Sequence, residues 1–208
     1  MKFKPTGLYA ITNESADLEQ KTAKILKAGV CLLQYRHKMA DFDFKIAQAR
    51  HIQAQCQQYK TPFIINDDID LAIEISADGV HLGKDDADLS QARQRLGDQA
   101  IIGISCYDQL ELALEGEKNG ADYIAFGRFF PSSTKPNAPQ APLLLLQQAQ
   151  RQINIPIVAI GGINLDNAPQ LIKQGAGLLA VIDSLFNTPD LTARTQQFRT
   201  LFEENIND

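Results

Sequence analysis

The chain has 208 residues, of which 44% are hydrophobic and 22% charged, and its 20 Lys+Arg against 25 Asp+Glu give a net charge of −5. A length of this order suits one domain, which we expect to span residues 1–208, and the composition excludes intrinsic disorder. The deficit of cations excludes bulk polyanions as partners, so we expect binding neither to nucleic acid nor to a membrane surface.

The cysteines show no pairing pattern. Cys31, Cys56 and Cys106 are widely spaced and odd in number, which predicts reduced thiols rather than a disulfide framework. No apolar signal-peptide core follows Lys2 and Lys4, and no stretch reaches the roughly 18 apolar residues that span a bilayer. We therefore expect a cytoplasmic protein.

Short apolar runs alternate with longer amphipathic segments along the chain. Eight runs predict β-strands, over Leu8–Ile11, Val30–Tyr35, Pro62–Asn66, Gly79–Leu82, Ile101–Ser105, Asp122–Phe126, Ile157–Ile160 and Leu178–Ile182. Their nearly continuous apolar content is typical of parallel strands buried on both faces. Helices are predicted between them, among others over Asp17–Ala28, Asp41–Tyr59, Asp108–Asn119 and Leu165–Gln174.

Eight strand–helix units predict an α/β protein, specifically a single (β/α)8 TIM barrel. The alternative is a doubly wound open sheet, which usually has a glycine-rich turn after its first strand, whereas Thr12-Asn13-Glu14 follow that strand here. Residues 127–142 hold four of the nine prolines, and we expect a functional loop there, after the sixth strand. Barrel enzymes take their catalytic groups from the carboxyl ends of the strands, so the polar residues at those ends are the site candidates.

The second strand ends in a polar and cationic run. Side-chain alternation puts Gln34, Arg36 and Lys38 on one side, aimed into the same mouth of the barrel. The alternative is a solvated strand end, but two cations leaving a buried strand are poorly explained by solvation alone. We favour a function for them.

Acidic residues follow the third and fourth strands. Asp67 and Asp68 come after the third, and Asp85, Asp86 and Asp88 after the fourth. Carboxylates from adjacent strand ends can share Mg²⁺, which also binds substrate phosphate oxygens. Helix capping is the alternative for each of them, and some of the five are expected to cap.

The later strand ends offer hydrogen-bonding groups and a phosphate cradle. Ser105 has no histidine or lysine beside it in sequence, so we expect a hydrogen-bonding role, and His81 is expected to be structural. Hydroxyls and an ammonium gather over 131–136, and Gly161-Gly162 permits close approach of a ligand, so a phosphate is expected near the last strands. The layout implies two phosphate groups and no nucleophile between them.

The motifs together resemble those of the thiamine phosphate synthase family. They are Gln34-Tyr35-Arg36-His37-Lys38, Ile65-Asn66-Asp67, Asp78 to Asp86, Gly103-Ile104-Ser105, Pro131 to Pro136 and Ala159 to Ile163, in order between Leu8 and about Phe186. The resemblance implies a barrel that joins 4-amino-5-hydroxymethyl-2-methylpyrimidine diphosphate to a thiazole phosphate or its carboxylate. Diphosphate would leave, the aminopyrimidine cation would form, and the thiazole nitrogen would capture it.

Site roles follow from the same resemblance. Mg²⁺ would be bound by Asp67 and Asp86. Catalytic roles would fall to Arg36, Lys38, Ser105 and Lys135. Substrate contacts would come from Gln34, Tyr35, Arg36, His37, Lys38, Asn66, Ser105, Ser132, Ser133, Thr134, Lys135, Gly162, Ile182 and Asp183. Homo-oligomerisation is left open.

Three positions depart from the family pattern, and two alternatives remain. Lys84 stands where the family commonly has Gln, Ser132 where it has Thr, and Asp183 where it has Ser, so Asp183 would serve phosphate through its backbone N–H. The related thiazole tautomerase would carry a histidine two residues after Ser105, where this chain has Tyr107. A non-catalytic phosphate-binding barrel would have lost the metal carboxylates or Lys135.

Overall fold

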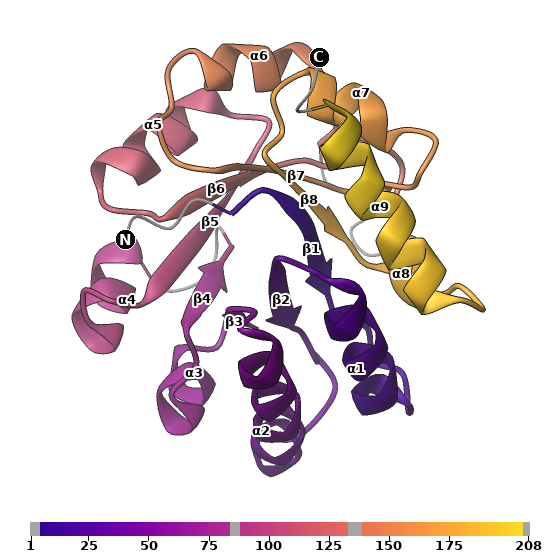
Figure 1. Cartoon of the computed structure of the whole chain (residues 1–208). Coiled ribbons are helices and arrows are strands. Elements are labelled where there is room, and N and C mark those ends of the chain that lie inside the picture. Colours follow the sequence, from indigo (N-terminus) through magenta and orange to yellow (C-terminus); the bar gives the residue numbers. More distant parts are fainter. Residues whose placement is uncertain (1–4, 84–87, 133–138, 206–208) are drawn as a thin grey trace.

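The computed structural model describes residues 5–83, 88–132 and 139–205. Within these residues, eight parallel strands close into a barrel in chain order (Figure 1). They are β1 Gly7–Ile11, β2 Leu32–Tyr35, β3 Phe63–Asn66, β4 Gly79–Leu82, β5 Ile101–Tyr107, β6 Tyr123–Phe126, β7 Ile157–Ile160 and β8 Leu178–Val181. Since β1 pairs with β8, the predicted (β/α)8 barrel is confirmed and the open-sheet alternative is excluded.

The boundaries of β4 and β7 are the predicted ones, and those of the other six strands differ from the prediction by one or two residues. The chain already bonds to the neighbouring strand before β2 and β6 begin: the Cys31 N–H donates to the Leu8 carbonyl at 3.0 Å, and the Asp122 N–H to that of Ile102 at 2.8 Å. β5 continues past Ser105 to Tyr107 through an irregularity in its pairing with β6. The apolar pattern of the sequence therefore cannot show where the residues that precede these strands end and the strands themselves begin.

The helices lie around the outside of the barrel (Figure 1). They are α1 Leu18–Ala28, α2 Phe42–Tyr59, α3 Ile69–Ile75, α4 Leu89–Leu96, α5 Leu110–Lys118, α6 Leu144–Gln150, α7 Ala168–Lys173, α8 Asp183–Phe186 and α9 Leu191–Asn205. Helix α7 starts later than predicted, because Asn164 accepts the backbone N–H groups of Asp166 and Asn167 and holds a turn there. In the described part of the chain, no helix combines the length and apolarity needed to cross a membrane.

Two of the acidic residues that follow β3 and β4 cap the helices after them. The Asp68 carboxylate accepts the Leu71 N–H at 2.9 Å at the start of α3. Asp88 accepts the Ser90 N–H at 3.2 Å at the start of α4. Both therefore cap helices, as the capping alternative expected for part of this group. Asp67 is not one of these two caps, and it lines the cavity described below.

Two apolar cores are separated by the barrel wall. The larger lies between the strands and the surrounding helices. The smaller fills the barrel interior and is formed by Tyr9, Ile11, Leu32, Ile64, Tyr123, Ala125, Val158, Leu178 and Ala180. Two tyrosines in so small a core are unusual residues for it, since a buried phenol hydroxyl requires a hydrogen-bond partner.

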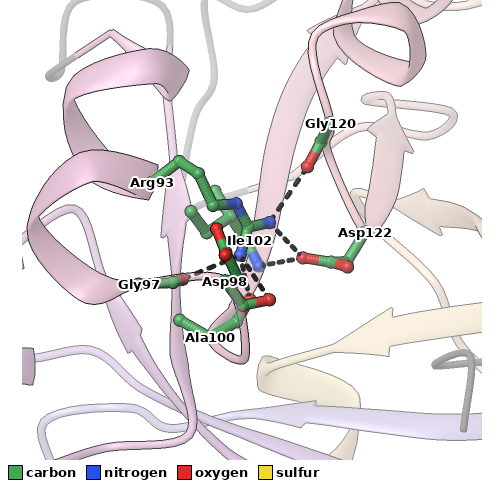
Figure 2. Close-up of polar contacts among 7 residues, drawn as sticks. All are labelled: Arg93, Gly97, Asp98, Ala100, Ile102, Gly120 and Asp122. Carbon is green, nitrogen blue, oxygen red and sulfur yellow. Dashed lines mark hydrogen bonds and ion pairs between the residues drawn. The ribbon is translucent and has the colours of Figure 1, made fainter.

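The amino-terminal end of the barrel is tied together by Arg93 (Figure 2). Its guanidinium donates to the carbonyls of Ala100 at 2.6 Å and Gly120 at 3.0 Å and to the Asp122 carboxylate at 2.7 Å. The same Asp122 oxygen accepts the Ile102 N–H at 2.8 Å. One cation thus joins the loops that lead into β5 and β6, at the end of the barrel opposite to the predicted site.

Candidate active site

A cavity of about 330 Å³ opens at the carboxyl end of the barrel. Its lower wall comes from inward residues of the strands, such as Tyr9, Val158 and Ala180, and its rim from the loops that follow them. The volume suits a small organic ligand. An open depression adjoins it, and the two hollows share Asn66 and Asp67.

Arg36 stands at the rim on the β2 side. The Thr12 hydroxyl accepts the Arg36 N–H at 2.8 Å and donates to the Arg36 carbonyl at 3.2 Å. This reciprocal pair fixes the backbone of the residue after β2. Thr12 itself is fully buried, and no motif in the sequence marked it. The backbone that carries this cation is therefore held in place, and Arg36 lines the cavity together with Asn66 and Asp67.

Lys38 and His37 line the open depression rather than the cavity. The Lys38 N–H donates to the Glu14 carboxylate at 3.0 Å, and the His37 Nδ1 accepts the Ala40 N–H at 3.2 Å. The expectation that Gln34, Arg36 and Lys38 point into one mouth is thus only partly met. The chain leaves strand geometry after Tyr35, so alternation no longer fixes where Lys38 points.

Tyr35 lies outside the cavity, so its predicted contact with substrate is corrected. Its ring is 1% exposed and packs near Phe63, and its hydroxyl donates to the Gln48 side chain of α2 at 2.9 Å. Alternation sends Tyr35 outward because its neighbour Gln34 points inward. Burial between barrel and helix raises the pKa of its phenol.

Asn66 and Asp67 stand between the two hollows. The Asn66 amide donates to the Asp67 carboxylate at 2.7 Å, and the Asp67 N–H donates to the His81 carbonyl at 2.9 Å. Asp67 has a left-handed backbone with φ of 61°, which Asp tolerates better than most residues. An oxygen donor at this place fits Mg²⁺. Its predicted partner Asp86 lies outside the described residues, among which no group of three metal-binding side chains gathers.

A chain of hydrogen bonds crosses the cavity floor. It runs from Ser105 Oγ to His81 Nε2 at 2.9 Å, from His81 Nδ1 to the Tyr123 hydroxyl at 3.1 Å, and from there to the Tyr9 hydroxyl at 2.8 Å. The Gln34 amide donates to Tyr9 at 2.6 Å. Burial raises the pKa of both phenols, so they stay protonated donors. Ser105 has no histidine beside it in sequence, but the fold brings one from β4.

The far wall is formed by the loops after β6 and β7. The Phe129 N–H donates to the Ile160 carbonyl at 3.1 Å and the Phe130 N–H to the Gly161 carbonyl at 3.0 Å. A Cβ on Gly162, whose φ is 66°, would lie 2.3 Å from the Pro131 carbonyl oxygen. The sequence predicted that Gly161-Gly162 would permit close approach of a ligand. In the structure, these glycines permit the loops after β6 and β7 to approach each other closely. Gly162 and Ser132 line the cavity that these loops enclose.

The last wall is the turn from β8 into α8. Ile182 and Asp183 line the cavity, as does Ser184. An Asp183 carboxylate oxygen accepts the Asn187 amide at 3.4 Å. The carboxylate thus has a partner within the same turn, and the role of the Asp183 backbone toward phosphate stays a prediction.

Some predicted site residues fall outside the described part, and some lining residues were missed. Ser133, Thr134 and Lys135 lie in the first group, with Asp86 and Lys84. Arg128, Tyr107 and Asn164 line the cavity without having been assigned a role in binding. Gly127 beside Arg128, and Gly162 two residues before Asn164, were the available signals for two of them.

Comparison with known proteins identifies the relatives of this chain. A family described as thiamine monophosphate synthase matches residues 8–185. A thiamine-phosphate synthase of Aromatoleum aromaticum is 48% identical over 95% of this chain and 96% of its own length. One of Nitrosospira multiformis is 50% identical over 95% of this chain and 86% of its own.

A solved structure gives the same answer for the fold. The thiamine phosphate pyrophosphorylase of Pyrococcus furiosus superposes with a TM-score of 0.88 at 33% identity, over 97% of both chains. The resemblance inferred from the motifs is confirmed, and the chain belongs to the thiamine monophosphate synthase family.

Proposed function

We propose that this chain is a transferase that couples 4-amino-5-hydroxymethyl-2-methylpyrimidine diphosphate with 4-methyl-5-(2-phosphoethyl)thiazole to give thiamine phosphate and pyrophosphate. Where the thiazole carboxylate is the substrate, CO₂ is released as well. Relatives near 48% identity over almost the whole chain carry the name of this activity. The observation that carries the proposal is that one cavity has Arg36 on one wall and the Gly162 and Ile182 loops on another. Such a cavity offers separate places for two phosphorylated molecules.

The pyrimidine diphosphate would occupy the side formed by β2, β3 and β5. Arg36 and Asn66 would bind diphosphate oxygens, with Lys38 reaching them from the adjoining depression. Gln34 and Ser105 would hold the ring through its polar edge. Lys135 completes this set as an expectation from the family motif.

The thiazole phosphate would occupy the opposite side. Backbone N–H groups near Gly162 and Ile182 would bind the phosphate, as is common for the loops after the last two strands of a barrel. Ser132, Ser133 and Thr134 would add hydroxyl donors from the loop after β6. In this arrangement the thiazole nitrogen would face the exocyclic methylene carbon of the pyrimidine, from which the diphosphate leaves.

Asp67 would hold Mg²⁺ together with Asp86. The ion, when bound, would neutralise charge on the diphosphate. Asp67 suits this role because its carboxylate lies between the two hollows and leaves helix capping to Asp68.

Positioning and charge stabilisation would provide most of the catalysis. Arg36 and Lys38 would stabilise the negative charge that grows on the departing diphosphate, and the aminopyrimidine would delocalise the positive charge left behind. The thiazole nitrogen would then form the new C–N bond. No protein nucleophile is required, and Ser105 would act by holding the ring. We propose a cytoplasmic location for the reaction, as the reduced thiols suggest.

The test is a coupled assay on the purified protein with both heterocycles and Mg²⁺. Thiamine phosphate and pyrophosphate should appear in equal amounts. Folded protein that forms neither product would overturn the proposal. The thiazole tautomerase alternative predicts isomerisation of the thiazole carboxylate without pyrophosphate release, so the same assay separates the two activities.

A further inference from the structure

The direction of each hydrogen bond across the cavity floor follows from the number of protons available. Gln34 Nε2 donates to the Tyr9 oxygen, so the single Tyr9 proton is left for the Tyr123 oxygen 2.8 Å away. Tyr123 accepts that hydrogen bond and donates its own proton in a hydrogen bond to His81 Nδ1 at 3.1 Å. A phenol donates one hydrogen bond but can accept two, so the directions follow from requiring that each buried phenol proton has an acceptor within this chain of bonds.

The same logic sets the proton on the histidine. Since Nδ1 of His81 accepts from Tyr123, the neutral ring carries its proton on Nε2 and donates it to Ser105 Oγ, 2.9 Å away. The Ser105 hydroxyl proton then points to a ligand rather than to the protein. Ser105 therefore faces the cavity as a donor.

At the other end of the chain, Gln34 faces the cavity as an acceptor. One of its two Nε2 protons is donated to Tyr9, and among the described residues its Oε1 has no hydrogen-bond partner. Every buried side-chain nitrogen and oxygen in that part of the structure has a partner, so Oε1 must be open to the cavity that Gln34 lines. One donor and one acceptor thus lie at the two ends of a single network.

The barrel is built around this network. A Cβ on Gly103 of β5 would lie 1.9 Å from the Tyr123 ring, so only glycine at this position leaves room for that ring in the barrel interior. Tyr123 meets the Tyr9 ring edge-on at 5.8 Å and stacks on the His81 ring at 5.5 Å. Both tyrosines are about 1% exposed or less. A filled apolar core would need none of these polar groups, whose burial is favourable only when every bond is made.

We propose that Tyr9, Tyr123 and His81 are positioning residues that lock Gln34 as acceptor and Ser105 as donor, so that the cavity selects an aminopyrimidine edge over an oxopyrimidine edge. The inference rests on the proposed function. A 4-aminopyrimidine offers an exocyclic N–H donor and a ring nitrogen acceptor, which match Gln34 Oε1 and Ser105 O–H. A 4-oxopyrimidine offers a carbonyl acceptor and a ring N–H donor instead. Its acceptor would then face Gln34 Oε1 and its donor would face the Ser105 O–H, so neither hydrogen bond could form.

The first test needs no activity. In ¹⁵N-histidine NMR spectra of the free protein, His81 should appear as the Nε2–H tautomer, assigned by its loss in His81→Gln. The Nδ1–H tautomer, or a doubly protonated ring at neutral pH, would overturn the proposal, because either requires the opposite polarity at Tyr123.

The second test measures discrimination. The affinities of the aminopyrimidine diphosphate and its 4-oxo analogue are compared by calorimetry for wild type, Tyr123→Phe and Tyr9→Phe. Either substitution should lower the preference for the amino compound at least about tenfold, since one lost bond is worth about 1.4 kcal/mol or more. Affinity for pyrophosphate alone should be unchanged. A preference that stays at the wild-type ratio in both variants would overturn the proposal.

Tyr35→Phe is the matched control. It also removes a hydroxyl from a buried tyrosine, but that hydroxyl bonds to Gln48 of α2 on the outer side of the barrel. The amino preference should be retained in this variant. Because binding is measured without the thiazole, a protein that selects the amino compound but forms no thiamine phosphate would refute the proposed function and leave this inference standing.

Discussion

Arg36 brings a positive charge to the rim of the cavity. Its backbone is clamped on both sides by the buried Thr12 hydroxyl. The overall charge of −5 gives no hint of this local cation. A guanidinium that extends from a fixed backbone into the cavity lined by Asn66 and Asp67 can stabilise charge that develops on a diphosphate there.

Arg36→Ala should therefore lower kcat/KM for the pyrimidine diphosphate by about 10²-fold or more, as expected for a lost charge-stabilising donor. Steady-state pyrophosphate release measures the effect. Arg50→Ala is the control, since Arg50 is an exposed arginine that pairs with Glu74 on the outer helices. Equal activity of the two variants would remove Arg36 from the diphosphate site.

At the scale of elements, the loops after β6 and β7 support each other. Gly162 has a positive φ and no room for a Cβ against Pro131, so the two loops meet at their backbones. The Phe129 and Phe130 N–H groups bond to β7 and its loop. The wall proposed to bind the thiazole phosphate is thus one two-loop unit.

Gly162→Ala should lower kcat/KM for the thiazole phosphate by about 10- to 100-fold, because the wall must shift to admit the methyl group. The KM for the pyrimidine diphosphate should change less. Gly97→Ala is the control: its φ of 83° imposes similar backbone strain, but no atom lies within 4 Å of the added Cβ. If both variants kept full activity, the two-loop wall would not be part of the site.

The opposite end of the barrel depends on Arg93. Its pair with Asp122 is largely shielded, with side chains 22% and 32% exposed, and the guanidinium also bonds to backbone carbonyls. Arg93→Ala should lower the free energy of unfolding by about 2–4 kcal/mol. Urea denaturation measures this change. Arg95→Ala removes an exposed pair with Asp70 and should cost under about 1 kcal/mol. Equal costs would contradict the role assigned to Arg93.

For the whole molecule, the sequence predicts the barrel more completely than the site. Continuous apolar strands and their spacing suffice for the fold, and alternation suffices to point Gln34 inward. The family motif from Gln34 to Lys38 also assigned a substrate contact to Tyr35. Side-chain alternation contradicts that assignment, because it puts Tyr35 on the outer face of the barrel. The His81 network joins residues as far as 114 positions apart across the barrel, and no local pattern encodes such a distance.

Burial of the thiols makes the free energy of unfolding of the whole molecule depend on pH. Desolvation raises the pKa of Cys56 and of Cys106 from 9.0 to about 12. The unfolded thiols ionise above about pH 9 whereas the folded ones do not, so stability is retained below that pH and lost between 9 and 12. Each thiol should lower the free energy of unfolding by up to about 1.4 kcal/mol per pH unit there.

Urea unfolding at about pH 8 and pH 10.5 measures this decline. The double variant Cys56→Ala with Cys106→Ala should be less stable at the lower pH but should lose less on alkalinisation, while other titrating groups contribute equally to both proteins. Parallel declines in the two proteins would show that the thiols do not contribute.

The most direct test of the whole account is a crystal structure with thiamine phosphate and pyrophosphate bound. Pyrophosphate should lie against Arg36 and Asn66, the ring against Gln34 and Ser105, and the phosphate of thiamine phosphate at the Gly162 and Ile182 loops. Products bound outside this cavity, or with the two phosphate positions exchanged, would contradict the account.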